Sequence, residues 1–190
     1  MRFSSLLVAS LVAAPLMAQQ PAGGAPATPP QPPANFPKVG DMAPDFTAPI
    51  AGKDGVGQPV TLSKLKGKVV VLAFYPQDRT TGCTAEMTKY TKEYTNLFGD
   101  GVVVLPISKD NLDSHTSWAK DMGMPFSLVS DTAGTVAQLY ASQRQPGAAF
   151  TRNTFVIGKD GKIAAATFRM NAMAEDSYTA LKDAVAAAKK

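Results

Sequence analysis

The stretch VVVLAFYPQDRTTGC, residues 69–83, decides the fold class. Its first seven residues form a continuous apolar run rich in β-branched and aromatic side chains, which predicts a central strand covered on both faces. Pro76 ends this run, because proline cannot donate to a strand ladder. A polar loop follows and leads into a helix. Cys83 is therefore expected where a buried strand passes into a helix.

The helix after this loop is predicted from a repeating apolar stripe. Its members recur at steps of four, three, four and three residues, which is typical of one buried helix face. They are Cys83, Met87, Tyr90, Tyr94 and Leu97. Cys83 thus begins the stripe that faces the core.

A second strand and helix follow. Residues 102–107 are predicted to form a buried strand, with Pro106 at its end or at an irregularity. Asn111 is a candidate helix cap and Gly123 a helix stop. The helix between them would share one face among Leu112, His115 and Ala119.

The C-terminal half continues the alternation of strands and helices. We expect a short strand at residues 126–129, then a helix capped by Asp131, a hairpin that turns at Gly161 and a terminal helix. The two helices would carry Val136, Leu139 and Tyr140, and then Tyr178, Leu181 and Val185. This order predicts an α/β fold, a three-layer sandwich with a central mixed sheet flanked by helices.

The first residues have the pattern of a secretory signal peptide. Residues 1–18 contain Arg2 near the start, an apolar stretch too short to span a membrane, and Ala18 at a small-residue cleavage region. We expect cleavage after Ala18 and export to the periplasm or the medium.

Composition indicates one domain behind a linker. Residues 19–36 are rich in Pro, Ala and Gly and are expected to be disordered, which leaves residues 37–190 as a single domain. The net charge is only +4, and the basic residues do not cluster into a stripe, which disfavours nucleic acid as a partner. No apolar run after the leader is long enough for a membrane span, so no membrane partner is expected.

The chain has one cysteine and one histidine. A disulfide within the chain is therefore impossible, and most zinc sites are excluded, because structural zinc takes four Cys or His ligands. We expect no metal, haem or flavin. His115 has Trp118 close by on the apolar side of its helix, which favours a packed histidine over a catalytic one.

The loop PQDRTTGC, residues 76–83, resembles the active-site loop of the peroxiredoxins, including the AhpC/TSA and bacterioferritin-comigratory-protein-like members. Pro76, Thr80 and Cys83 fit the pattern Pro-x-x-x-Thr-x-x-Cys without a gap. Three further segments are similar to that family in the expected order: GDMAPDF at 40–46, LKGK at 65–68 and RNTFVI at 152–157. The resemblance implies a thioredoxin-like fold and a peroxide-reactive Cys83.

The residue types fit that chemistry. A thiol attacks a peroxide as a thiolate, and the first turn of a helix favours the anion through unpaired N–H groups and the helix dipole. The resemblance places Arg152 beside the sulfur, where a guanidinium would hold both thiolate and peroxide. The Thr80 hydroxyl and the backbone N–H groups of Thr81, Gly82 and Cys83 would bind the peroxide oxygens.

Two further residues have supporting roles in this hypothesis. Pro76 would shield the thiolate and fix the loop, since its ring locks φ. Glu86 fits the family's Cys-x-x-Glu pattern and would orient Arg152 through an ion pair. A carboxylate so close to Cys83 would disfavour the thiolate without that partner.

The cycle implied is of the one-cysteine kind. One common family pattern places a resolving cysteine five residues after the first, where this chain has Thr88. An external thiol, either a thioredoxin-like protein or a low-molecular-weight thiol, would therefore reduce the sulfenic acid on Cys83. The substrates expected are hydrogen peroxide and alkyl hydroperoxides, in antioxidant defence, and the protein would be a monomer or homodimer.

Two hypotheses from other classes stay open. A thiol-disulfide oxidoreductase of the same fold is disfavoured, because a Cys-x-x-Cys pair is missing. A noncatalytic thioredoxin-like binding or chaperone module would keep Cys83 inert toward peroxide.

Overall fold

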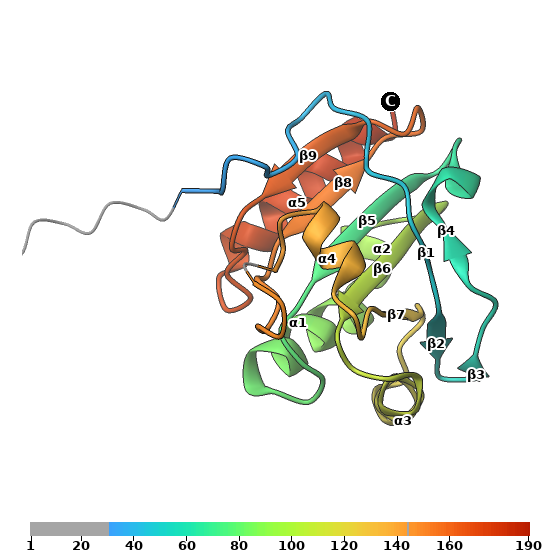
Figure 1. Ribbon diagram of the computed structural model, residues 1–190. Coiled ribbons are helices and arrows are strands. Elements are labelled where there is room, and N and C mark those ends of the chain that lie inside the picture. Colours follow the sequence, from blue (N-terminus) through green and yellow to red (C-terminus); the bar gives the residue numbers. More distant parts are fainter. Residues whose placement is uncertain (1–30, 144) are drawn as a thin grey trace, which may run out of the picture. The chain divides into compact units, whose positions relative to one another are not determined.

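The computed structural model describes residues 31–143 and 145–190 (Figure 1). The predicted signal peptide and the linker up to residue 30 lie outside the described residues. The elements are β1 (Thr47–Ala48), β2 (Ile50–Gly52), β3 (Gly55–Val56), β4 (Val60–Thr61), the 3-10 helix η1 (Leu62–Leu65), β5 (Val69–Phe74), α1 (Thr81–Lys92), α2 (Tyr94–Leu97), β6 (Val102–Ser108), α3 (Leu112–Met122), β7 (Leu128–Ser130), α4 (Thr135–Leu139), β8 (Thr154–Ile157), β9 (Ile163–Thr167) and α5 (Glu175–Ala188).

Strand β5 lies inside a mixed sheet, as predicted. Among the described residues, seven strands pair in the order β3-β2-β7-β6-β5-β8-β9. Strand β5 is parallel to β6 and antiparallel to β8, and all six of its residues are buried. A strand with neighbours on both edges and cover on both faces needs apolar side chains at every position, which explains the uninterrupted run.

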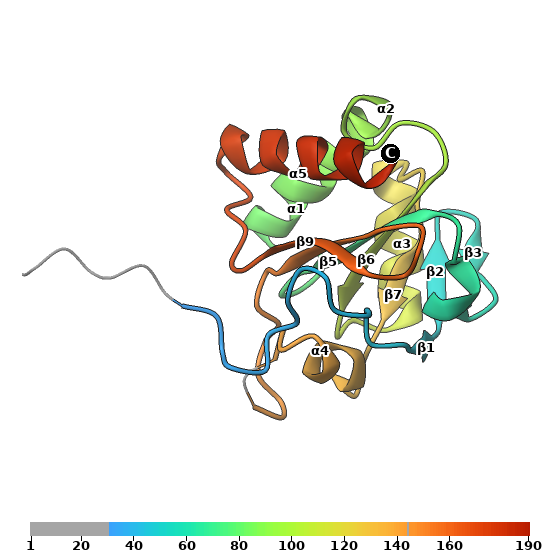
Figure 2. The same ribbon diagram turned by 90° about the horizontal axis from the view of Figure 1, so that it is seen from above.

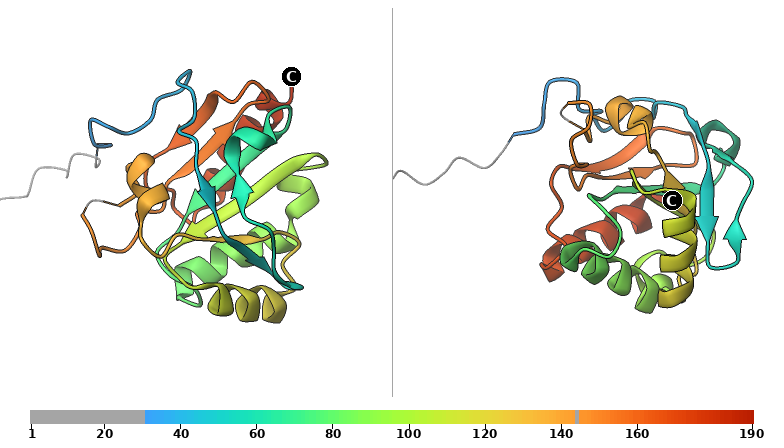
Figure 3. Two further views of the ribbon diagram at one scale, coloured as in Figure 1. Left: turned by 45° about the vertical axis from the view of Figure 1, so that its right-hand side comes forward. Right: turned by 60° about the horizontal axis from the view of Figure 1, so that its bottom comes forward.

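Helices cover the two faces of the sheet. One core cluster joins the β5 side chains Val69, Val71 and Ala73 to α1, α2, α3 and α5, and the other joins Val70, Leu72 and Phe74 to α4 and the N-terminal strands. Figure 2 shows α1 and α5 on one side of the sheet and α4 on the other, and the right panel of Figure 3, turned to bring the bottom forward, shows the same separation. The predicted three-layer α/β sandwich is confirmed.

The stripe that begins with Cys83 is divided between two helices. Helix α1 ends at Lys92, and Glu93 leaves helical geometry with φ −111° and ψ 23° before α2 begins. The predicted single helix is wrong in this respect. Thr91 and Thr95 flank the break, and β-branched residues weaken a helix.

Pro106 lies inside β6, opposite Ala73 of β5, and not at the end of the strand. The carbonyl of Ile107 accepts from Tyr75, so the imino nitrogen of Pro106 points to the other edge, toward β7. Strand β7 pairs only with Ile107 and Ser108. Pro106 therefore removes no ladder hydrogen bond, which is why this prediction was wrong.

Helix α3 has the predicted ends. The Asn111 side chain accepts from the Ser114 N–H at 2.9 Å, and Gly123 adopts the left-handed conformation at φ 62°. The hairpin of β8 and β9 and the terminal helix α5 are confirmed too, with Gly161 at φ 84° in the turn and the predicted α5 stripe buried.

Helix α4 departs from prediction. It begins at Thr135, and Gly134 is its N-cap residue, although the buried Asp131 carboxylate does accept from the Ala137 N–H at 2.8 Å. Leu139 is 44% exposed, whereas Val136 and Tyr140, the other two residues of the predicted stripe, are buried, so the prediction that Leu139 faces the core is wrong.

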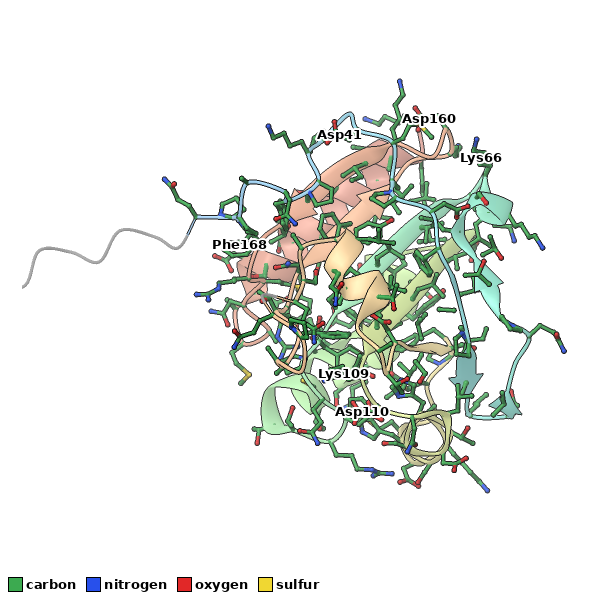
Figure 4. All side chains as sticks on the ribbon, in the orientation of Figure 1. Asp41, Lys66, Lys109, Asp110, Asp160 and Phe168 are labelled. Carbon is green, nitrogen blue, oxygen red and sulfur yellow. The ribbon has the colours of Figure 1, made fainter. Side chains whose placement is uncertain are left out.

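The N-terminal part of the domain was not predicted in detail. Strand β2 pairs antiparallel with β7 and extends the main sheet, while β1 and β4 form a separate pair. Phe36, assigned to the linker from sequence, packs against Phe155 and Phe168 at ring-centroid distances of 5.1 and 5.6 Å. Figure 4 labels Phe168 beside this segment.

Within the described residues, no helix is long and apolar enough to cross a membrane.

Candidate active site

Cys83 lies in the first turn of α1, just after the loop that leaves β5. Thr80 is the N-cap residue, and the first helical hydrogen bond runs from the Thr84 N–H to the Thr80 carbonyl at 2.8 Å. The N–H groups of Thr81, Gly82 and Cys83 precede this bond and have no partner within the helix. Three backbone donors are thus available at the end of α1 that carries the sulfur.

Arg152 reaches the sulfur from the segment that precedes β8. Its Nη2 lies 3.3 Å from Sγ of Cys83, and the side chain is 15% exposed. The Arg152 carbonyl accepts from the Met170 N–H at 2.7 Å, which fixes its backbone. Burial opposes the charge of the guanidinium, but Glu86 and Cys83 outweigh this and raise the pKa of Arg152. Arg152 therefore remains a cation beside the sulfur.

Glu86, three residues after Cys83 on α1, forms an ion pair with Arg152. Its carboxylate Oε2 accepts from Nη1 of Arg152, and the Glu86 side chain is fully buried. Burial raises the pKa of Glu86, while Arg152 and the Tyr90 hydroxyl oppose part of this rise. The guanidinium is therefore held by two partners at once, the carboxylate through Nη1 and the sulfur through Nη2.

The other predicted residues surround this group. The Thr80 hydroxyl donates to the Gln77 carbonyl at 3.1 Å and so is directed into the loop rather than at the sulfur. A Cβ added to Gly82 would lie 3.4 Å from Nη2 of Arg152, so the guanidinium packs closely over this glycine. Pro76 is half-buried, and Thr81 is exposed on the first turn.

The sulfur is covered in this conformation, since Cys83 has no exposed area. The residues beside it reach the surface: Thr80 and Thr81 are exposed, and Gly82 is half-buried. A peroxide can therefore reach the sulfur only after a group that covers it moves.

Asp78 anchors the loop, and sequence reasoning missed it. Its carboxylate accepts from the Tyr75 and Ser114 hydroxyls at 2.7 Å each and lies 3.0 Å from Nδ1 of His115. Burial disfavours its charge, but the bonds from His115, Tyr75 and Ser114 outweigh this and lower the pKa of Asp78. His115 is a packed histidine, as expected from its apolar surroundings. Its need for a buried partner was the signal that could have located Asp78.

Two more contacts fix the same loop. The Asp78 N–H donates to Oδ2 of Asp110 at 2.9 Å, and Figure 4 shows Asp110 at the end of the molecule where α1 begins. Arg79 has a positive φ of 61° and binds Ser117 and Asp121 of α3 through its guanidinium. A left-handed arginine is uncommon, and these bonds to α3 help to hold it.

Cys83 has no second thiol beside it in this chain. No group of three or more His, Cys, Asp or Glu side chains within residues 31–143 and 145–190 could hold a metal ion. The whole chain has one cysteine. The described site thus consists of one sulfur beside an arginine and the start of a helix.

The chain is similar to known proteins over most of its length. Residues 39–166 match the model of the AhpC/TSA family. The chain is 39% identical over 134 residues to a putative peroxiredoxin bcp of Coxiella burnetii, which covers 67% of this chain and 86% of that protein. It is 38% identical over 135 residues to a chloroplastic peroxiredoxin Q of Sedum lineare, which covers 67% and 68%. Peroxidoxin BcpB from Mycobacterium tuberculosis superposes with a TM-score of 0.71 at 27% identity, over 82% of this chain and 100% of that one.

Proposed function

Since this chain belongs to the AhpC/TSA family of peroxiredoxins, we propose that it reduces hydrogen peroxide and alkyl hydroperoxides through Cys83 alone, with electrons from an external thiol. The observation that supports this most is the position of Arg152, whose guanidinium contacts both the Cys83 sulfur and the Glu86 carboxylate.

The first step is the attack of the Cys83 thiolate on one peroxide oxygen. The S–O bond forms as the O–O bond breaks, which leaves a sulfenic acid on Cys83 and releases an alkoxide or hydroxide that takes up a proton. Negative charge moves from sulfur to the leaving oxygen. In this proposal Arg152 and the N–H groups of Thr81 and Gly82 would donate to this charge, and such donors stabilise a transition state more than a ground state.

The second step restores the thiol. One molecule of external thiol attacks the sulfenic sulfur, which forms a mixed disulfide and releases water. A second thiol then displaces Cys83 as a thiolate and leaves as a disulfide. A single cysteine in the chain supports this one-cysteine cycle, and a thioredoxin-like protein or a low-molecular-weight thiol would serve as reductant.

Export and antioxidant defence complete the proposal. The pattern of residues 1–18 supports removal of a signal peptide, after which the enzyme would act on peroxides in the periplasm or the medium. Sequencing the N-terminus of the protein purified from each cell fraction tests this. A mature chain that begins at Gln19 is expected, and a cytosolic chain that retains residues 1–18 would contradict export.

Substitution of the nucleophile tests the peroxidase itself. Cys83→Ser should abolish thiol-dependent peroxide consumption, because a hydroxyl at this site cannot form a sulfenic acid. Thr84→Ser, one residue further along α1, is the matched control and should retain activity. Equal rates for Cys83→Ser and the wild type would refute the assignment.

One observation favours a second candidate, a noncatalytic thioredoxin-like binding module. Cys83 has no exposed area, and a thiol that stays covered would be inert. Mass spectrometry of the protein after exposure to peroxide separates the two. An unmodified Cys83 would favour the binding module, and an oxidised Cys83 favours the peroxidase.

A further inference from the structure

The second oxygen of the Glu86 carboxylate faces the hydroxyl group of Tyr90. The hydroxyl donates to Oε1 at 3.1 Å, whereas Oε2 accepts from Arg152. Tyr90 lies four residues after Glu86 on α1, the spacing that brings two side chains together on one helix face. Both residues are fully buried.

The surroundings of Glu86 leave few groups to hold its charge. Arg152 faces it from the segment before β8, Cys83 and Tyr90 share α1 with it, and Tyr178 approaches from α5. Of these, the Tyr178 hydroxyl is turned away and donates to the Ala172 carbonyl at 2.7 Å. Arg152 and Tyr90 are thus the two donors to this carboxylate that the described residues provide.

Tyr90 is suited to remain a donor. Burial, followed by the neighbouring Glu86, raises the pKa of Tyr90 well above its usual value, so its hydroxyl keeps its proton. Among the described residues, its other acceptor is the Met170 sulfur at 3.7 Å, a weaker one than a carboxylate oxygen. The ring is fixed by edge contacts with Phe98 and Tyr178.

We propose that Tyr90 is a positioning residue of the peroxidase site, whose hydroxyl fixes the Glu86 carboxylate and, through it, the Arg152 guanidinium against Cys83. This inference rests on the proposed function. The order of contacts is Tyr90 to Glu86, Glu86 to Arg152, and Arg152 to the sulfur, and each adjacent pair is in direct contact.

Loss of the Tyr90 hydroxyl should change how the rate of the peroxide reaction depends on pH. Only the charged form of Glu86 forms the ion pair with Arg152, and the hydroxyl stabilises that form. Its removal therefore raises the pKa of Glu86 beyond the rise that burial already causes. The carboxylate then takes up a proton at a higher pH, and Arg152 loses its partner there. Activity on the acid side should be lost at a higher pH than in the wild type.

The test compares Tyr90→Phe with Tyr94→Phe. Both variants keep the aromatic ring and remove one hydroxyl, but the Tyr94 hydroxyl donates to the Val102 carbonyl, away from the site. We expect Tyr90→Phe to react with peroxide about tenfold more slowly at neutral pH, with its acid limb about one pH unit higher, as the loss of one hydrogen bond to a charged group implies. Tyr94→Phe should match the wild type in both measurements.

The outcomes separate this inference from the proposed function. The inference is overturned if Tyr90→Phe behaves like Tyr94→Phe, or if its rate falls equally at every pH, since a merely structural role would give a uniform loss. A wild-type protein that does not consume peroxide would refute the proposed function, and the positioning role with it.

Discussion

Nη2 of Arg152 lies 3.3 Å from Sγ of Cys83, although the two residues are 69 positions apart in the chain. The antiparallel pairing of β5 with β8 creates this contact, because it sets Ala73 opposite Thr154 at the end of β5 from which the Cys83 loop departs. The reactive group is thus assembled by the central sheet and not within one local segment.

Arg152→Lys should slow the reaction with peroxide by about 10²-fold, in line with the loss of one donor to a developing charge. A lysine keeps the charge but has no planar fork to contact sulfur and carboxylate together. Stopped-flow measurement of thiol oxidation gives the rate. Arg169→Lys is the matched control, because Arg169 is exposed and packs on the Phe168 ring. Equal rates in the two variants would show that Arg152 does not act on the sulfur.

Thr80→Val should lower the peroxide rate, whereas Thr80→Ser should stay near the wild type. The hydroxyl donates to the Gln77 carbonyl and so shapes the loop at the start of α1, and serine retains this bond. The rate of the valine variant is expected to fall by about tenfold, because one hydrogen bond is lost. Steady-state peroxide consumption at saturating thiol provides the comparison. A serine variant as slow as the valine variant would contradict a role for the hydroxyl.

Asp78→Asn should destabilise the fold by about 2–3 kcal/mol at neutral pH, because a buried carboxylate with three partners is replaced by a group that accepts fewer bonds. Urea unfolding gives this value. Asp113→Asn, an exposed substitution in the first turn of α3, should cost less than about 1 kcal/mol. Equal losses in the two variants would mean that Asp78 does not anchor the loop.

The same substitution should change the response to acid. The folded pKa of Asp78 is lowered, so its contribution to stability is present above its ordinary value of about 3.9 and is lost as the pH falls through the folded value. The wild type should therefore lose its advantage over Asp78→Asn as the pH falls below about 4. Urea unfolding at a series of acidic pH values tests this, and a constant difference between the two proteins would count against it.

Local patterns in the sequence were sufficient for much of the fold. The run at β5, the Asn111 cap, the Gly123 stop and the turn at Gly161 each depend on the chemistry of adjacent residues. Such signals are short-range, and the structure confirms them. The pairing of the loop with Arg152 came from resemblance, since no local pattern links residues so far apart.

Other features depend on contacts that a local pattern does not contain. Pro106 is tolerated inside β6 because of where β7 begins, and Leu139 is exposed although Val136 and Tyr140 of the same predicted stripe are buried. The strands β1 to β4 have two or three residues each, too few to show a period of their own. Asp78 stands in a polar loop, and only its contacts with α3 reveal that it is buried.

The most direct test of the peroxidase is to add peroxide to the reduced protein without a thiol and to trap the product with a reagent specific for sulfenic acids. Mass spectrometry should find the trapped adduct on Cys83 in the wild type, and addition of a thiol before the trap should remove it. A Cys83 that stays a free thiol while peroxide persists would contradict the account.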